Sequence, residues 1–270
     1  MRQLLARDRP PLLPLLIGVV HLLPTPGAPR FAGDVDAILS RAREDARALA
    51  ENGADALIVE NFGDAPFFAE HVPAETVAAL TRAVDAALQE AAGRPVGVNV
   101  LRNDARAALG ICAATGASFL RVNVHSGAAL TDQGLIEGRA AETLRERARL
   151  CPDVVLLADV HVKHALPLGG GSIADAAEET RRRGLADALI VSGAATGRPP
   201  EREELVAVRE RVSDTPLLIG SGLDDSNAAE LLASADGAIV GTWLKRGGRL
   251  EEPVDPERVR RLRATFDALA

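Results

Sequence analysis

Short apolar runs alternate along this chain with longer segments in which apolar residues recur at helical spacing. The apolar runs are rich in Val, Ile and Leu, and they predict strands at 15–21, 56–61, 95–100, 118–125, 154–162, 188–193, 216–222 and 237–242. Runs this short are typical of parallel strands that are buried on both faces. The segments between and after them predict helices at 34–52, 73–92, 104–115, 137–150, 172–183, 201–212, 224–234 and 256–268.

Several of the predicted helices begin with residues that cap helix N-termini. Asp34, Asp104, Ser172 and Asp224 each precede a helical run, and their side chains can accept hydrogen bonds from the first free backbone N–H groups. For Asp104, which follows a strand, the alternatives of helix cap and site residue stay open.

Eight strands that alternate with eight helices predict parallel βαβ units with right-handed crossovers. In 270 residues this arrangement favours one α/β domain, a closed (β/α)₈ (TIM) barrel over 1–270 with an N-terminal lead-in at 1–14. An open doubly wound sheet is the alternative, but the dinucleotide-binding pattern GxGxxG does not follow the first strand,.

Charge and composition narrow the choice of partners. The net charge is −7 and basic residues are mixed with acidic ones along the helices, which argues against a nucleic-acid polymer. The two cysteines, Cys112 and Cys151, have no CxxC spacing and are interpreted as structural thiols of a reducing compartment. The apolar run 12–20 is interrupted by proline and glycine and is interpreted as a buried strand rather than a signal peptide. We therefore expect a cytoplasmic protein without a transmembrane segment, and a homo-oligomer stays open.

All five histidines fall at or beyond predicted strand ends, on the face where barrel enzymes place their active sites. They are His21, His71, His125, His161 and His164. In the fifth strand, Asp159, His161 and Lys163 alternate, and strand geometry would point all three side chains the same way. An internal salt bridge is the alternative interpretation.

Five residues are therefore predicted to be catalytic through acid–base chemistry. They are His21, Glu60, Asp159, His161 and Lys163. Of the 31 basic residues only Lys163 and Lys245 are lysines, and lysine, unlike arginine, can lose its charge when it is buried.

Other polar residues near the strand ends are predicted to bind the ligand. Asn99, Asn123 and Ser192 belong to this set, and Arg121, Asn123 and His125 alternate along the fourth strand. Asn99 and Asn123 lie between valines, where burial requires hydrogen-bond partners. They could instead belong to a polar inner layer of the barrel.

The last two strands predict a phosphate cradle, because the loops after strands 7 and 8 of this fold frequently bind phosphate. Glycine lets backbone N–H groups approach phosphate oxygens. The residues assigned to the cradle are Gly220, Ser221, Gly222, Gly241, Thr242 and Lys245.

A divalent metal is a further hypothesis, with His21, Glu60, Asp159 and His161 as candidate ligands. No HxH or HExxH spacing supports it. Three stretches after strands are interpreted as long loops that could cover the pocket, namely Gly127–Glu137, 168–172 and 196–198.

Several stretches resemble the BtpA/SgcQ family over residues from about 15 to 248. They are IGVVHLLPTPGAPR, VNVLRND, RVNVHSGAALTDQGLIEG, ADVHVKHALPLGGGSI, DALIVSGAATG, PLLIGSGL and GAIVGTWLKRGG. The resemblance implies a TIM barrel, and it carries two functional associations, photosystem I biogenesis and labels as phosphoribosylanthranilate isomerase-like proteins. It transfers no settled set of catalytic residues.

Three functions are compatible with these features. The first is an enzyme for a small phosphorylated sugar- or nucleotide-like metabolite, working as an isomerase, a lyase or a glycosyl-bond-cleaving enzyme. The second is a non-catalytic assembly or regulatory factor, and the third is a metabolite sensor. A scaffold alone gives no reason for ionisable groups at a barrel mouth, so we expect the enzyme.

Overall fold

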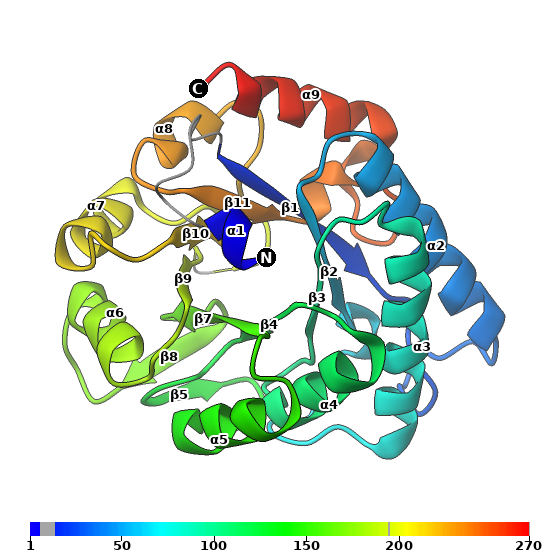
Figure 1. The fold of residues 1–270 in the computed structure, drawn as a ribbon, viewed down its shortest axis with the longest axis horizontal. Coiled ribbons are helices and arrows are strands. Elements are labelled where there is room, and N and C mark those ends of the chain that lie inside the picture. Colours follow the sequence, from blue (N-terminus) through cyan, green and yellow to red (C-terminus); the bar gives the residue numbers. More distant parts are fainter. Residues whose placement is uncertain (6–13, 194, 270) are drawn as a thin grey trace.

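Eight parallel strands close into a barrel at the centre of the molecule (Figure 1). The computed structural model describes residues 1–5, 14–193 and 195–269. Around the barrel the order is β1-β11-β10-β9-β7-β4-β3-β2. The strands are β1 (Leu15–His21), β2 (Ala56–Glu60), β3 (Val96–Asn99), β4 (Phe119–Val122), β7 (Val155–Val160), β9 (Ala188–Val191), β10 (Leu217–Ile219) and β11 (Gly237–Val240). The predicted (β/α)₈ barrel is confirmed.

The helices form an outer ring around the strands (Figure 1). They are α2 (Val35–Glu51), α3 (Ala74–Glu90), α4 (Ala105–Thr115), α5 (Ala140–Leu150), α6 (Ile173–Arg182), α7 (Arg202–Arg211), α8 (Ala228–Leu232) and α9 (Pro256–Asp267). Short 3₁₀ helices, η1 (Phe62–Asp64), η2 (Thr242–Leu244) and η3 (Arg246–Gly248), follow β2 and β11. Among the described residues, no helix is long and apolar enough to cross a membrane.

The capping residues act mostly as predicted. The side chains of Asp34, Asp104 and Ser172 each accept a hydrogen bond from the backbone N–H three residues on, so Asp104 serves as a cap. Asp224 instead accepts from Ser226 and Asn227 in a turn, and α8 is shorter than the predicted helix 224–234.

The barrel interior is apolar at one end and polar at the other. Side chains such as Ile17, Phe119 and Leu157 form an inner cluster, and Met1, Leu4 and Leu5 of the lead-in pack against it. The short helix α1 (Arg2–Leu5) therefore covers the end from which the strands start (Figure 1). Residues 6–13 of the predicted lead-in lie outside the described residues. The opposite end, where the strands finish, is left for polar side chains.

The interpretation of Gly127–Glu137 as a loop is wrong, whereas 169–172 and 196–198 contain no helix or strand, as predicted. The first stretch forms two strands of a three-stranded antiparallel sheet in the order β6-β5-β8, with β5 (Ala128–Thr131), β6 (Gly134–Glu137) and, after β7, β8 (Ala165–Leu168). Strand β8 pairs with β5 across more than thirty residues of chain, with Leu130 opposite Leu166. Such distant pairing leaves no local signal in the sequence.

Candidate active site at the barrel mouth

A cavity with two lobes opens where the barrel strands end. The glycine lobe, of about 230 Å³, is lined by residues that include His21, Gly220–Gly222 and Gly241–Trp243. The amide lobe, of about 330 Å³, is lined by residues that include Phe62, Asn99, Arg102, Asn123 and Asp132. Among the described residues, four line both lobes and so mark their junction, namely Glu60, Arg121, Lys163 and Thr196.

The glycine lobe brings together five of the six residues assigned to the phosphate cradle. They are Gly220, Ser221 and Gly222 after β10 and Gly241 and Thr242 after β11. Among the described residues, the backbone N–H groups of Gly222 and Thr242 have no hydrogen-bond partner. They remain available to an anion.

The glycines of this lobe leave room for neighbouring groups. A methyl group on Gly241 would lie 2.5 Å from Cε1 of His21, and one on Gly220 would lie 3.2 Å from Nη2 of Arg121.

The Ser221 hydroxyl donates to the carbonyl of Arg198 at 2.9 Å and accepts from the N–H of Gly193 at 3.1 Å. Ser221 therefore fixes the segment after β9 with its side chain.

Arg121, from β4, is the central cation of the site. Its guanidinium donates to both carboxylate oxygens of Asp159 at 2.8 Å and lies 3.5 Å from Oε1 of Glu60. Burial opposes its charge, but the two carboxylates outweigh burial and raise the pKa of Arg121. The predicted alternative of an internal salt bridge therefore holds for Asp159, whose partner is Arg121 rather than a lysine.

The polar residues around Asp159 complete this buried network. Asn123 donates to it at 2.9 Å and Ser192 at 3.3 Å. Asn123 lines the amide lobe, and its Oδ1 is buried without a partner among the described residues. Ser192 and Asp159 line neither lobe. Asp159 therefore positions Arg121 from outside the cavity, and Ser192 supports Asp159.

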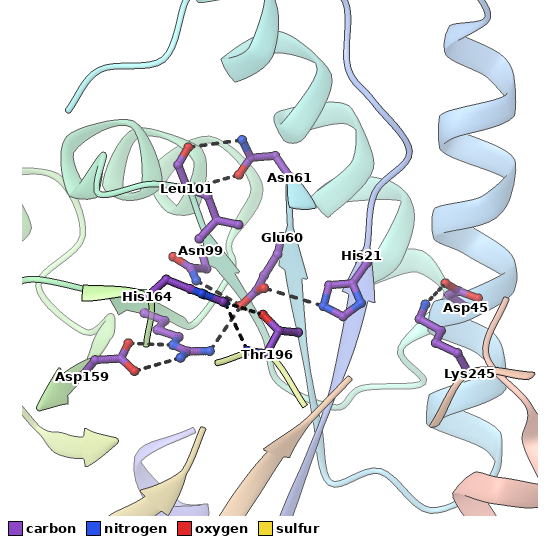
Figure 2. Close-up of polar contacts among 11 residues, drawn as sticks. His21, Asp45, Glu60, Asn61, Asn99, Leu101, Asp159, His164, Thr196 and Lys245 are labelled. Carbon is purple, nitrogen blue, oxygen red and sulfur yellow. Dashed lines mark hydrogen bonds and ion pairs between the residues drawn. The ribbon is translucent and has the colours of Figure 1, made fainter. Parts of the chain in front are cut away.

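Glu60 and His21 face each other at the ends of β2 and β1 (Figure 2). Oε2 of Glu60 lies 3.8 Å from Nε2 of His21, and Oε1 accepts from Asn99 at 3.0 Å. Burial, together with the charges of Lys245, Lys163 and Arg121, lowers the pKa of His21 well below its ordinary value. His21 is therefore neutral near pH 7, and a neutral imidazole beside a carboxylate can pass a proton.

Lys163 lies at the junction of the lobes, three residues beyond β7. Burial and the charge of Arg121 lower its pKa to about 8, although Glu60 and Asp159 oppose this shift. Its backbone carbonyl accepts from Arg102 at 2.6 Å.

His161 does not join this group. Strand β7 ends at Val160, and His161 has a positive φ of 52°, so the alternation expected for Asp159, His161 and Lys163 stops before it reaches His161. Among the described residues, His161 lines neither lobe.

Lys245 is also absent from the lining of both lobes. Its Nζ lies 2.5 Å from Oδ2 of Asp45 in α2, and both side chains are 1% exposed. Figure 2 shows the pair to one side of the polar cluster. The prediction that Lys245 belongs to the cradle is therefore wrong, because a carboxylate outside the barrel wall takes its charge.

The other histidines lie at varied places around the mouth. His164 lines the amide lobe and its Nε2 lies 3.1 Å from both N and Oγ1 of Thr196. His125 is buried with Nε2 at 2.7 Å from the carbonyl of Gly184, and His71 is an exposed neighbour of Asp104. Of the five histidines predicted at or beyond strand ends, His21 and His164 therefore line the cavity.

The metal hypothesis does not fit the donor atoms. Among the described residues, no group of three or more His, Cys, Asp or Glu side chains could hold a metal ion. Both oxygens of Asp159 are taken by Arg121, and His161 lies outside the cavity, so the four candidates do not converge.

Two arginines of the site, Arg121 and Arg102, are not among the residues predicted from the sequence. For Arg121 the available signal is a charged residue within an apolar strand, where burial requires a partner. The other residues that sequence patterns miss, Arg102 and Thr196, reach the site from loops. Arg102 is only 5% exposed, but loops have no periodic pattern from which the direction of a side chain can be predicted.

These features define the class of protein: a (β/α)₈ barrel with an ionisable pocket at the carboxyl ends of its strands. The chain belongs to the BtpA family, whose model matches residues 14–267. It is 51% identical over 244 residues to the photosystem I biogenesis protein BtpA of Synechocystis sp., covering 90% of this chain and 85% of that protein. It is 49% identical to the uncharacterized protein TK2179 of Thermococcus kodakarensis, covering 92% and 93%.

Solved structures share the fold at low identity. Thiamine phosphate pyrophosphorylase from Pyrococcus furiosus matches with a TM-score of 0.57 at 15% identity, covering 96% of this chain and 97% of that one. N-(5'-phosphoribosyl)anthranilate isomerase from Pyrococcus furiosus matches with a TM-score of 0.57 at 12% identity, covering 94% and 99%. At such identities the likeness concerns the barrel alone.

Proposed function

We propose that this protein is an enzyme that acts on a small phosphorylated sugar- or nucleotide-like metabolite. The observation that carries the proposal is the glycine lobe, in which Gly220–Gly222 and Gly241–Thr242 line one cavity with Arg121 and Lys163. Backbone N–H groups at glycine turns, next to cationic side chains, suit a phosphate group. The two solved barrels above are named for reactions of phosphorylated compounds, which agrees with this class of ligand.

In this proposal the phosphate enters the glycine lobe and the reacting part of the substrate reaches the junction. Arg121 stabilises negative charge there, held in place by Asp159. Glu60 moves a proton through Oε2, because Oε1 is occupied by Asn99 and Arg121. Neutral His21, 3.8 Å away, exchanges that proton. Isomerisation, lyase chemistry and glycosyl-bond cleavage all use such steps.

The test compares ligands that differ only in phosphate. Sugar phosphates and nucleoside monophosphates should raise the melting temperature of the protein, whereas the corresponding sugars and nucleosides should not. Thr242→Asp places a negative charge in the glycine lobe and should abolish the rise. Thr242→Asn has nearly the same size without the charge and should retain most of it.

Failure of every phosphorylated compound to stabilise the folded wild-type protein would contradict the proposal. The search would then turn to a protein partner, in keeping with the biogenesis role in the name of the Synechocystis relative.

A further inference from the structure

The two lysines of the chain have opposite environments. Lys245 is fully buried and its Nζ is paired with Asp45. Lys163 lines both lobes of the cavity, and among the described residues its Nζ has no hydrogen-bond or ion-pair partner. A long flexible side chain that is brought into a pocket and left unpaired is available to a ligand.

The backbone around Lys163 is fixed although its side chain is free. Its carbonyl accepts from the buried Arg102 at 2.6 Å. The next residue, His164, is tied to Thr196 at 3.1 Å through both the backbone N–H and the hydroxyl, as Figure 2 shows. Anchors on both sides hold the lysine at the junction of the two lobes, which limits the entropy lost when Nζ meets a ligand.

We propose that Lys163 is a nucleophile that forms a Schiff base with the carbonyl carbon of a phosphorylated aldehyde or ketone. This inference rests on the proposed function, because the glycine lobe would hold the phosphate while the carbonyl reaches the junction. The two lobes meet at Lys163, so a short phosphorylated carbonyl compound can span them.

The step balances without an oxidant or a reductant. The lone pair of the neutral amine forms a C–N bond to the carbonyl carbon as the C=O π bond opens; the oxygen takes a proton, and the nitrogen, now cationic, releases one. The hydroxyl of the resulting carbinolamine takes a second proton and leaves as water while the nitrogen lone pair forms the C=N bond, which leaves an iminium ion. Glu60, which lines both lobes, is placed to supply and take back protons, and water reverses the sequence.

The electrostatics agree with this geometry. Burial and the charge of Arg121 lower the pKa of Lys163 to about 8. About a tenth of the side chain is then neutral at pH 7, compared with less than about a thousandth for an ordinary lysine. Arg121 could not replace it, because a guanidinium stays protonated and is a poor nucleophile.

The experiment traps the iminium by reduction in the full chain. The protein is incubated with glyceraldehyde 3-phosphate, dihydroxyacetone phosphate or a longer sugar phosphate and cyanoborohydride, and its mass is measured. We expect one adduct, heavier by the carbonyl compound less one oxygen atom, on the peptide that contains Lys163. With two lysines in the chain, only Lys245 and the Met1 amine compete, and the pairing of Lys245 with Asp45 should protect it.

The control variant Lys163→Arg keeps the positive charge but cannot form the adduct. Glycerol 3-phosphate, which has no carbonyl group, should raise the melting temperature of both this variant and the wild type. Adduct formation in the wild type should reach half its maximal rate near pH 8, whereas a half-maximum above pH 10 would contradict an activated lysine.

The outcomes separate this inference from the proposed function. Stabilisation by glycerol 3-phosphate without an adduct at Lys163, or with adducts only at Met1 or Lys245, would overturn the Schiff base and leave the phosphorylated ligand standing. An adduct at Lys163 that forms equally well with unphosphorylated glyceraldehyde, without stabilisation by any phosphate compound, would support the Schiff base and refute the phosphate cradle.

Discussion

Arg121 and Asp159 form a two-point ion pair inside the barrel, with Nε and Nη2 each 2.8 Å from a carboxylate oxygen. The arginine side chain is 2% exposed and the aspartate side chain is fully buried. The pair joins β4 to β7, which are adjacent in the barrel. Through Glu60, 3.5 Å from Nη1, it also sets the position of the carboxylate that faces the junction.

Arg121→Met should destabilise the protein strongly, because it leaves Asp159 buried without its countercharge. Loss of one partner of a buried pair costs about 3–5 kcal/mol of unfolding free energy. Denaturant titration of the variant measures this loss. The double variant Arg121→Met/Asp159→Leu should recover part of it, and a double variant less stable than either single one would contradict the pairing.

The site and the fold differ in how far the sequence predicts them. Each barrel strand is a local apolar run, so it can be predicted from its own sequence without knowing which strands lie beside it. The sheet β6-β5-β8 depends on pairing between Leu130 and Leu166, which are far apart in the sequence, so no local pattern predicts it. Helix ends followed their capping residues, except at α8, where Asp224 begins a turn before the helix.

Site residues on strands were easier to predict than those beyond them. Glu60 and Asn99 lie on β2 and β3, and their contact follows from parallel register. The direction of His161 depends on a positive φ of 52°, which alternation cannot anticipate. Asp45, whose carboxylate pairs with Lys245, lies 200 positions away in α2. No local sequence pattern predicts this pairing.

Lys245→Met should lower stability without weakening the site. The variant leaves Asp45 with a charge in a position that is 1% exposed, at a cost of about 3–5 kcal/mol. Folded protein should still bind phosphorylated ligands with wild-type affinity, as calorimetry below the melting temperature would show. Loss of binding in a folded Lys245→Met protein would restore this residue to the cradle.

The neutral state of His21 should appear in the pH dependence of stability. Its pKa is lowered well below the ordinary value by burial first and by Lys245, Lys163 and Arg121 after it. The unfolded chain therefore takes up a proton near pH 6.5 that the folded chain does not. This contribution to stability is complete above that pH and is lost as the pH falls, by up to about 1.4 kcal/mol per unit.

Replacement of His21 by Gln should therefore flatten the loss of unfolding free energy between pH 6.5 and 5 by up to that slope. Denaturant titrations at several pH values measure it. His71→Gln is the matched control, because the side chain of His71 is 63% exposed and outside both lobes. Equal slopes in the wild-type and His21→Gln proteins would show that His21 takes up a proton in the folded protein as readily as in the unfolded chain.

Gly222→Ala should remove ligand binding through the backbone rather than through a lost contact. A methyl group there would collide with the main chain of Arg198 and Pro199, and Ser221 ties the same segment to the glycine lobe.

The matched control is Gly127→Ala. Gly222 has a φ of 70°, and Gly127 has nearly the same φ of 71° with nothing within 4 Å of an added methyl group. Alanine at either position pays a similar cost of about 1 kcal/mol for the left-handed backbone, so the difference between the two variants isolates the collision. We expect Gly127→Ala to keep the ligand-induced rise in melting temperature and Gly222→Ala to lose it; the same rise in both would mean that the segment after β9 does not shape the lobe.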